Sequence, residues 1–174
     1  EGVRPKKELV GTIGKMQAPR SKEELMSYMG MLEFYNRFIP NLASRTHSMR
    51  ELLKKGVVFM WSECCEAEFQ ETKRELEKAP NLQAFVPGRK TSITTDASNK
   101  GVGAVLMQHN KGENLTIAFA SRSLSKAESV YSVIEREALA VHWALKKFKN
   151  FIWGYEFVVK TDHKPLREIF EKKD

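Results

Sequence analysis

The sequence changes character at the Pro87-Gly88 step. Before this step, apolar residues recur at intervals of three and four, which is the period of helices packed on one face. After it, short β-rich runs alternate with turn residues. A length of 174 residues allows one domain or two small ones. We therefore expect an α+β chain with a boundary near residues 86–90: a small helical module over 1–88 and a mixed α/β domain over 89–174.

Residues 21–54 have the pattern of helices. Ser21 and Glu24 have the spacing of a capping box, which marks a helix start. The apolar residues that follow share one helix face: Leu25, Met29, Leu32, Tyr35 and Ile39. Pro40 interrupts this pattern. Two further helices are expected after it, over residues 42–53 and 62–80.

The second half predicts a sheet with one long helix. The expected order is β-β-β-α-β, at residues 91–95, 101–108, 115–121, 132–151 and 155–161. Lys111-Gly112 is a hairpin signal, so the first three strands are expected to form an antiparallel meander. Gly154 ends the long helix, and Pro165 is a candidate start for another.

Composition narrows the class of protein. The chain has 29 Lys and Arg against 22 Asp and Glu, and this net charge of +7 favours an anionic partner, nucleic acid first. A hydrophobic content of 41% excludes disordered and collagen-like classes. No run of about 18 apolar residues is present, so no membrane partner is expected. The polar start lacks both a signal peptide and an initiator Met, so we expect a piece of a longer protein.

The cysteines and histidines do not suggest a zinc site. Cys64 and Cys65 are adjacent, which is unlike a zinc knuckle and unfavourable for a disulfide between them. A reducing, intracellular compartment is the expectation.

Aspartate is scarce, which makes each position informative. Of the 22 acidic residues only three are Asp: Asp96, Asp162 and Asp174. Asp96 ends the first expected strand and Asp162 ends the fourth. If these strands are parallel neighbours, both carboxylates lie at one edge of the sheet. The long helix, packed across the sheet, can bring Glu137 to the same edge.

Three neighbouring carboxylates predict a divalent cation. Without one, their mutual repulsion raises their pKa values. Hard oxygen ligands suit Mg²⁺ or Mn²⁺ rather than Zn²⁺, and two such ions about 4 Å apart can promote attack of water on a phosphodiester. Each acid alone also fits an ordinary role, in a turn or at a helix start. Only the joint topology favours the metal site.

Several motifs stand in a fixed order along the chain. In the second half they occupy residues 95–98 (Thr-Asp-Ala-Ser), 101–106, 119–124, 131–148 and 161–166. In the first half they occupy residues 2–5, 30–32, 35–40 and 59–62. Together they resemble the thumb and ribonuclease H region of the reverse transcriptase of gypsy-type LTR retrotransposons, a part of the pol polyprotein.

The resemblance implies an enzyme part that cuts the RNA strand of RNA–DNA hybrids by two-metal-ion hydrolysis, while the thumb-like module grips the hybrid. By position, Asp96, Glu137 and Asp162 correspond to the family's catalytic, metal-binding carboxylates, with two Mg²⁺ or Mn²⁺ ions as cofactors. Glu137 is preferred over Glu135 because it directly precedes the apolar Ala-Leu-Ala run. The implied partners are a hybrid or template–primer duplex and the polymerase palm and fingers. The implied location is cytoplasmic or nuclear, in a retroelement particle.

Two departures from the family bear on activity. The polymerase palm is absent, so polymerisation by this chain alone is not expected. The family's fourth acid follows a fifth strand, whereas Asp174 comes too early to be that acid. The ribonuclease H-like domain is therefore expected to lack its last strand and helix, with weak activity or none in isolation. The alternative is a non-catalytic, retroelement-derived module that binds nucleic acid or protein.

Other side chains have two open interpretations. Ser98 and Asn99 suit contacts to the 2′-hydroxyls of RNA, or a loop turn. Lys146, Lys147 and Lys149 suit phosphate contacts that fix the register of a hybrid, or a solvated face. The following aromatic residues suit base stacking, or more often a core: Tyr35, Phe38, Trp61 and Phe69.

Overall fold

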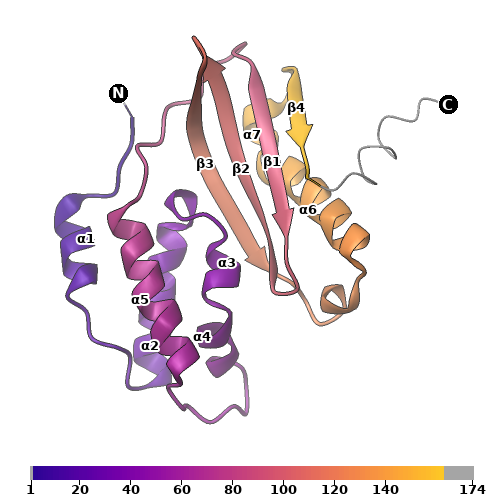
Figure 1. The fold of residues 1–174 in the computed structure, drawn as a ribbon. Coiled ribbons are helices and arrows are strands. Elements are labelled where there is room, and N and C mark those ends of the chain that lie inside the picture. Colours follow the sequence, from indigo (N-terminus) through magenta and orange to yellow (C-terminus); the bar gives the residue numbers. More distant parts are fainter. Residues whose placement is uncertain (1, 163–174) are drawn as a thin grey trace.

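The computed structural model describes residues 2–162 and confirms the α+β class (Figure 1). The helical part contains α1 (Lys7–Gly14), α2 (Lys22–Phe34), the 3-10 helix η1 (Asn36–Phe38), α3 (Leu42–Arg45), α4 (His47–Leu52) and α5 (Glu63–Glu77). The sheet part contains β1 (Thr91–Ala97), β2 (Gly101–Asn110), β3 (Glu113–Ser123), the 3-10 helix η2 (Glu128–Val130), α6 (Val133–Lys147), α7 (Lys149–Ile152) and β4 (Phe157–Lys160). The expected helix at Pro165 and the expected absence of a fifth strand lie outside the described residues.

In the first half of the chain, helices form at the positions that the capping motif and the apolar face predict. The Ser21 hydroxyl accepts a hydrogen bond from the Glu24 amide at 3.2 Å, which starts α2. The five face residues expected from the sequence are all buried. Tyr35, Phe38 and Phe69 lie in this core, and Trp61 packs against it half-buried. For these aromatic side chains the structure therefore supports the core interpretation over base stacking.

Helix boundaries differ from the prediction at three places. The expected helix over 42–53 is divided at Thr46, whose hydroxyl donates to the Leu42 carbonyl at 2.8 Å. Such a bond competes with regular helix geometry. The expected helix over 132–151 is divided at Phe148, between α6 and α7. Helix α1 was not predicted, and two of its eight residues are Gly, which disfavours a helix.

The sheet has the order β3-β2-β1-β4. The pairs β1–β2 and β2–β3 are antiparallel, as the meander predicted, and β1–β4 is parallel. Lys111 and Gly112 form the β2–β3 turn with φ values of 48° and 87°, the left-handed conformation that a tight hairpin needs. Helix α6 packs on β1 and β2, and η1 and α3 pack on β2 and β3.

The two faces of the sheet contact different parts of the chain. Ile93 and Leu106 belong to one hydrophobic cluster with Ala144 of α6 and with Phe148, which lies between α6 and α7. Phe119 of β3 instead packs against the core of the helical part. The sheet is therefore sandwiched between α6 and the helical module (Figure 1). The exact division of the chain into domains near residue 88 stays a prediction.

Candidate functional site

Asp96 and Asp162 lie at the same end of the sheet. Strands β1 and β4 run parallel with Thr91 paired to Phe157 and Thr94 to Lys160. The pairing ends at Thr94 and Lys160, so Asp96 lies in the last residues of β1 and Asp162 lies two residues beyond the end of β4. Both side chains are exposed. The predicted parallel pairing of the first and fourth strands is therefore confirmed.

Glu137 enters from helix α6. The helix begins with a capping box, in which the Ser132 amide donates to the Glu135 carboxylate at 2.8 Å and the Ser132 hydroxyl accepts from the Glu135 amide. Hydrogen bonds from the Ser132 side chain and backbone lower the pKa of Glu135. Glu135 is exposed, whereas Glu137 is buried with only 6% exposure. The two acids thus differ sharply in environment, and the preference for Glu137 stays a prediction.

Asp96 and Glu137 approach the carboxyl end of β1 from different sides. Successive side chains alternate across a strand, so Asp96 lies on the opposite face from Ile93, which packs toward α6. Asp96 is paired with Gly103 on the face that the helical module covers. Within residues 2–162, no group of three or more His, Cys, Asp or Glu side chains is gathered closely enough to hold a metal ion. The three-carboxylate metal set therefore stays a prediction.

The helical module supplies a residue that the sequence did not point to. The side-chain amide of Asn41 donates a hydrogen bond to Oδ2 of Asp96 at 3.0 Å. Asn41 immediately precedes α3 and has a left-handed backbone with φ of 51°. In the sequence Asn41 marked only a helix break, because a contact over 55 positions leaves no local signal.

Ser98 and Asn99 form the turn between β1 and β2. The Ser98 hydroxyl accepts hydrogen bonds from the amides of Lys100 and Gly101, both at 3.1 Å. It also lies 3.0 Å from the Ser44 hydroxyl of the helical module. These bonds support the turn role for Ser98. Asn99 is exposed, and contact of either residue with RNA stays a prediction.

The three candidate lysines are exposed on α6 and α7. Lys146 lies about 13 Å along the helix axis from Glu137 and on the opposite side of the helix. The Lys149 ammonium sits 4.7 Å from the centre of the Trp153 ring, a cation–π distance. Contact of the three lysines with a hybrid stays a prediction.

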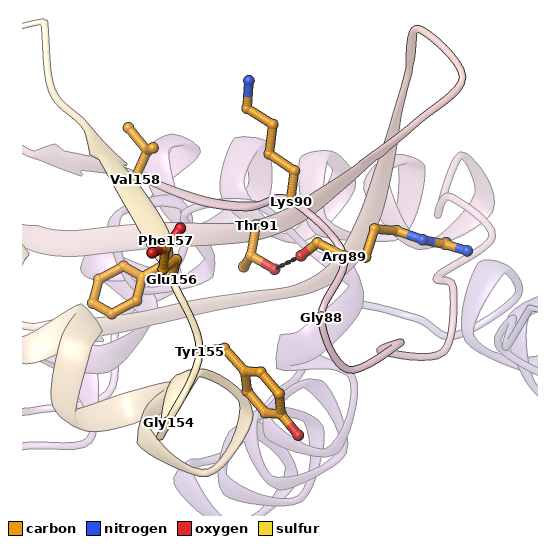
Figure 2. Close-up of a pocket in the computed structure, with 9 residues that line it drawn as sticks. All are labelled: Gly88, Arg89, Lys90, Thr91, Gly154, Tyr155, Glu156, Phe157 and Val158. Carbon is orange, nitrogen blue, oxygen red and sulfur yellow. Dashed lines mark hydrogen bonds between the residues drawn. The ribbon is translucent and has the colours of Figure 1, made fainter.

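A separate hollow lies at the other end of β1 and β4. It is lined by residues 88–91 and 154–158. Figure 2 shows Tyr155 extending from the segment that leads into β4 toward the side of Gly88, and the Thr91 hydroxyl bonded to the Arg89 carbonyl. Because the candidate acids follow the carboxyl ends of the two strands, this hollow at their amino ends belongs to a different region.

The family comparison agrees with the fold and with the sequence motifs. Residues 61–159, more than half of the chain, match the family model described as "RNase H-like domain found in reverse transcriptase". The chain belongs to this family. The match begins at Trp61, so it includes α5 as well as the sheet.

The curated relatives are retrotransposon polyproteins. The chain is 36% identical over 170 residues to the retrovirus-related Pol polyprotein from transposon 412 of Drosophila melanogaster, covering 98% of the chain and 14% of that polyprotein. It is 31% identical over 169 residues to the Tf2-3 polyprotein of Schizosaccharomyces pombe, covering 95% of the chain and 13% of that protein. The chain thus spans about a seventh of these relatives, and the predicted resemblance to retrotransposon Pol is confirmed.

Solved structures share the fold. A foamy viral protease-reverse transcriptase "dRH" in complex with double-stranded DNA matches with a TM-score of 0.79 and 22% identity, over 99% of this chain and 30% of that one. A foamy viral protease-reverse transcriptase in complex with an RNA/DNA hybrid matches with a TM-score of 0.74 and 23% identity, over 97% and 24%. Both matches extend across the helical part and the sheet.

Proposed function

We propose that this chain is the thumb and ribonuclease H region of a reverse transcriptase, and that it cleaves the RNA strand of RNA–DNA hybrids. The observation that carries the proposal is the parallel pairing of β1 and β4, because it brings the carboxyl ends of the two strands, near Asp96 and Asp162, to one end of the sheet. The family membership and the retrotransposon relatives support the same activity. The whole enzyme would also contain a polymerase part.

The donor set suits hard divalent cations. Asp96 and Asp162 offer exposed carboxylate oxygens, and Glu137 offers a buried one on α6. Carboxylate oxygens are the ligands that Mg²⁺ and Mn²⁺ prefer. Two bound ions would supply an activated water and stabilise the leaving 3′ oxygen. Asp96 and Asp162 would offer their oxygens at one end of the sheet, where both side chains are exposed to solvent.

The helical module would grip the duplex beside the cleavage site. It packs on β2 and β3 through η1 and α3, so it reaches the same end of the sheet as Asp96. The net charge of +7 favours binding to a phosphate backbone. The exposed Lys146, Lys147 and Lys149 supply further phosphate contacts.

The test uses an RNA–DNA hybrid labelled on its RNA strand, with Mg²⁺ or Mn²⁺. The 174-residue chain is compared with Asp96→Asn, which keeps the side-chain shape, and with Glu113→Gln, which removes a charge at the far end of the β2–β3 hairpin. We expect weak metal-dependent cleavage by the unaltered chain and by Glu113→Gln, because the chain is expected to lack the family's fourth acid. We expect no detectable cleavage by Asp96→Asn, with hybrid binding retained.

A second candidate is a non-catalytic module that binds nucleic acid. It is favoured by one observation: the acids of residues 2–162 are not gathered into a metal-binding group. Equal hybrid binding by all three proteins, with no cleavage under either metal, would establish this candidate and overturn the enzymatic proposal for this chain.

A further inference from the structure

We propose that the surface around Trp153 is a separate binding site for an unpaired nucleic-acid strand. The Trp153 surface lies in the hollow between α6, α7 and β4 and comprises Lys146, Lys149, Trp153, Tyr155 and Phe157. It is at the amino end of β4, whereas Asp162 follows the carboxyl end of that strand. Binding at this surface is independent of the proposed cleavage, because it needs neither the carboxylates nor a metal ion.

Trp153 is exposed to solvent rather than packed into the core. Its side chain is 73% exposed, whereas Trp side chains are highly buried on average. The Trp153 amide donates to the Lys149 carbonyl at 2.9 Å, at the end of α7. Gly154, with φ of 80°, then turns the chain toward β4. The indole therefore lies at the corner between a helix and a strand, where a planar ligand can reach it.

A cation accompanies the indole. The Lys149 ammonium lies 4.7 Å from the centre of the Trp153 ring, where the negative face of the ring attracts it. Lys146 lines the same hollow. Proteins that bind single strands combine aromatic rings, on which bases stack, with cations that hold the phosphates. Both kinds of group are present here side by side.

Tyr155 and Phe157 extend the aromatic surface. They line the same hollow as Trp153, with 42% and 36% of each residue exposed. The Tyr155 ring is supported from behind by Phe85, whose centroid lies 6.1 Å away, and Phe85 in turn contacts Phe151 at 5.6 Å. A side chain that is already held in place loses less entropy on binding. The surface therefore offers preorganised stacking faces for more than one base.

The charge around the surface suits a polyanion. Residues 154–157 also line the hollow at the amino ends of β1 and β4, so the two hollows adjoin (Figure 2). Their linings together carry four Lys or Arg side chains and one carboxylate: Arg89, Lys90, Lys146, Lys149 and Glu156. An apolar protein segment would gain nothing from this excess of positive charge. A phosphate backbone would, so nucleic acid is the favoured ligand.

The aromatic rings favour an unpaired strand over a duplex. In a duplex each base is covered by its neighbours, so an indole reaches a base face only after the base is unstacked. A single strand presents its base faces without that cost. Stacking is possible on every base, so we expect RNA and DNA single strands to bind with little sequence preference.

The first test measures fluorescence anisotropy of labelled oligothymidylate and oligouridylate, each about 12 nucleotides long, with the 174-residue chain in EDTA. Trp153→Ala should weaken binding of both about tenfold, and Trp153→Phe, which keeps a stacking face, should weaken it less. The matched control is Phe34→Ala, which removes a ring of 76% exposure on α2, outside the Trp153 surface. We expect Phe34→Ala to bind like the unaltered chain. Because Trp153 is exposed, its variants should keep the circular dichroism spectrum of the unaltered chain.

The second test concerns the cation. Lys149→Gln should weaken binding and reduce the slope of log affinity against log salt concentration by about 0.7, the value for one phosphate contact on a single strand. Lys149→Arg keeps the charge and should keep the slope. A slope that is the same in Lys149→Gln and in the unaltered chain would show that this ammonium does not contact phosphate, and would overturn its part in the site.

Three results would overturn the Trp153 site. The first is unchanged single-strand binding in Trp153→Ala, or an equal loss in Phe34→Ala. The second is a blunt RNA–DNA hybrid that competes as well as an unlabelled single strand and is weakened as much by Trp153→Ala, because the surface would then not select unpaired strands. The third is self-association of the chain in sedimentation that Trp153→Ala abolishes, without single-strand binding, because the surface would then be a protein interface. Cleavage of the hybrid is measured separately, so either proposal can fail while the other stands.

Discussion

Arg122 of β3 holds Glu128 of η2 through two parallel hydrogen bonds. Nη1 donates to Oε2 at 2.7 Å and Nη2 donates to Oε1 at 2.8 Å. The Ser125 amide donates to the same carboxylate at 2.8 Å. These bonds lower the pKa of Glu128 from 4.5 to about 2, with Arg122 as the first cause. The pair links the end of β3 to η2, within the segment that leads to α6, the helix that carries Glu137.

We predict that this pair makes the protein less stable in acid. Because the folded pKa of Glu128 is depressed, its contribution to the free energy of unfolding is present above about pH 4.5 and is lost as the pH falls toward 2. Glu128→Gln should lower the free energy of unfolding at pH 7 by about 1–2 kcal/mol. Urea denaturation at a series of pH values measures both effects. Glu113→Gln is the charge control, and an identical pH dependence in both variants would contradict the prediction.

A second prediction concerns alkaline pH. Tyr28 is buried in the helical core, its hydroxyl lies 2.8 Å from that of Thr72, and burial raises its pKa to about 12. The Thr72 hydroxyl already donates to helix carbonyls, so Tyr28 is the donor. The folded pKa exceeds the unfolded value of 10, so stability should fall as the pH rises from about 10 to 12.

The test is Tyr28→Phe, which removes the ionisable hydroxyl and keeps the ring. It should cost about 1 kcal/mol at pH 7, because the bond to Thr72 is lost. It should also reduce the loss of stability between pH 10 and 12. A decline of equal steepness in the variant would show that Tyr28 does not govern the alkaline limit.

Local patterns in the sequence predicted most of the fold. Ser21 does cap α2, and Lys111-Gly112 does make the hairpin, since each signal lies within four residues of the feature it specifies. The break at Thr46 was missed because a side-chain hydroxyl, rather than a Pro or Gly, divides α3 from α4.

The candidate site was predicted only in part. The alternation of strands and the positions of Asp96 and Asp162 were sufficient to predict a shared sheet edge. The bond from Asn41 was not predictable, because it depends on how the helical module docks on the far face of the sheet. Gly103 gave no signal either, since its requirement for a missing side chain arises only from that docking.

A third prediction concerns the contact between the helical module and the sheet. Ser121→Ala leaves the Ala43 amide without its acceptor at a buried position, which should cost about 1–3 kcal/mol of unfolding free energy. Ser123, two residues along the same strand, is the matched control because its buried hydroxyl has no hydrogen-bond partner among the described residues. Ser123→Ala should be neutral or slightly stabilising. Equal losses in the two variants, measured by urea denaturation, would mean that the Ser121 bond does not stabilise the interface.

The last prediction distinguishes the roles of Glu135 and Glu137, two acids on α6. Glu135 closes the capping box with Ser132, so Glu135→Ala should lower the free energy of unfolding by about 1 kcal/mol and leave cleavage and Mn²⁺ binding unchanged. Glu137→Gln keeps the shape of a buried side chain but removes its charge, so it should abolish metal-dependent cleavage of the hybrid and weaken Mn²⁺ binding. Both variants are measured by urea denaturation, cleavage and Mn²⁺ titration. If Glu135→Ala lost cleavage while Glu137→Gln retained it, the assignment of the acid on α6 would be reversed, because the two side chains lie about 200° apart around the helix.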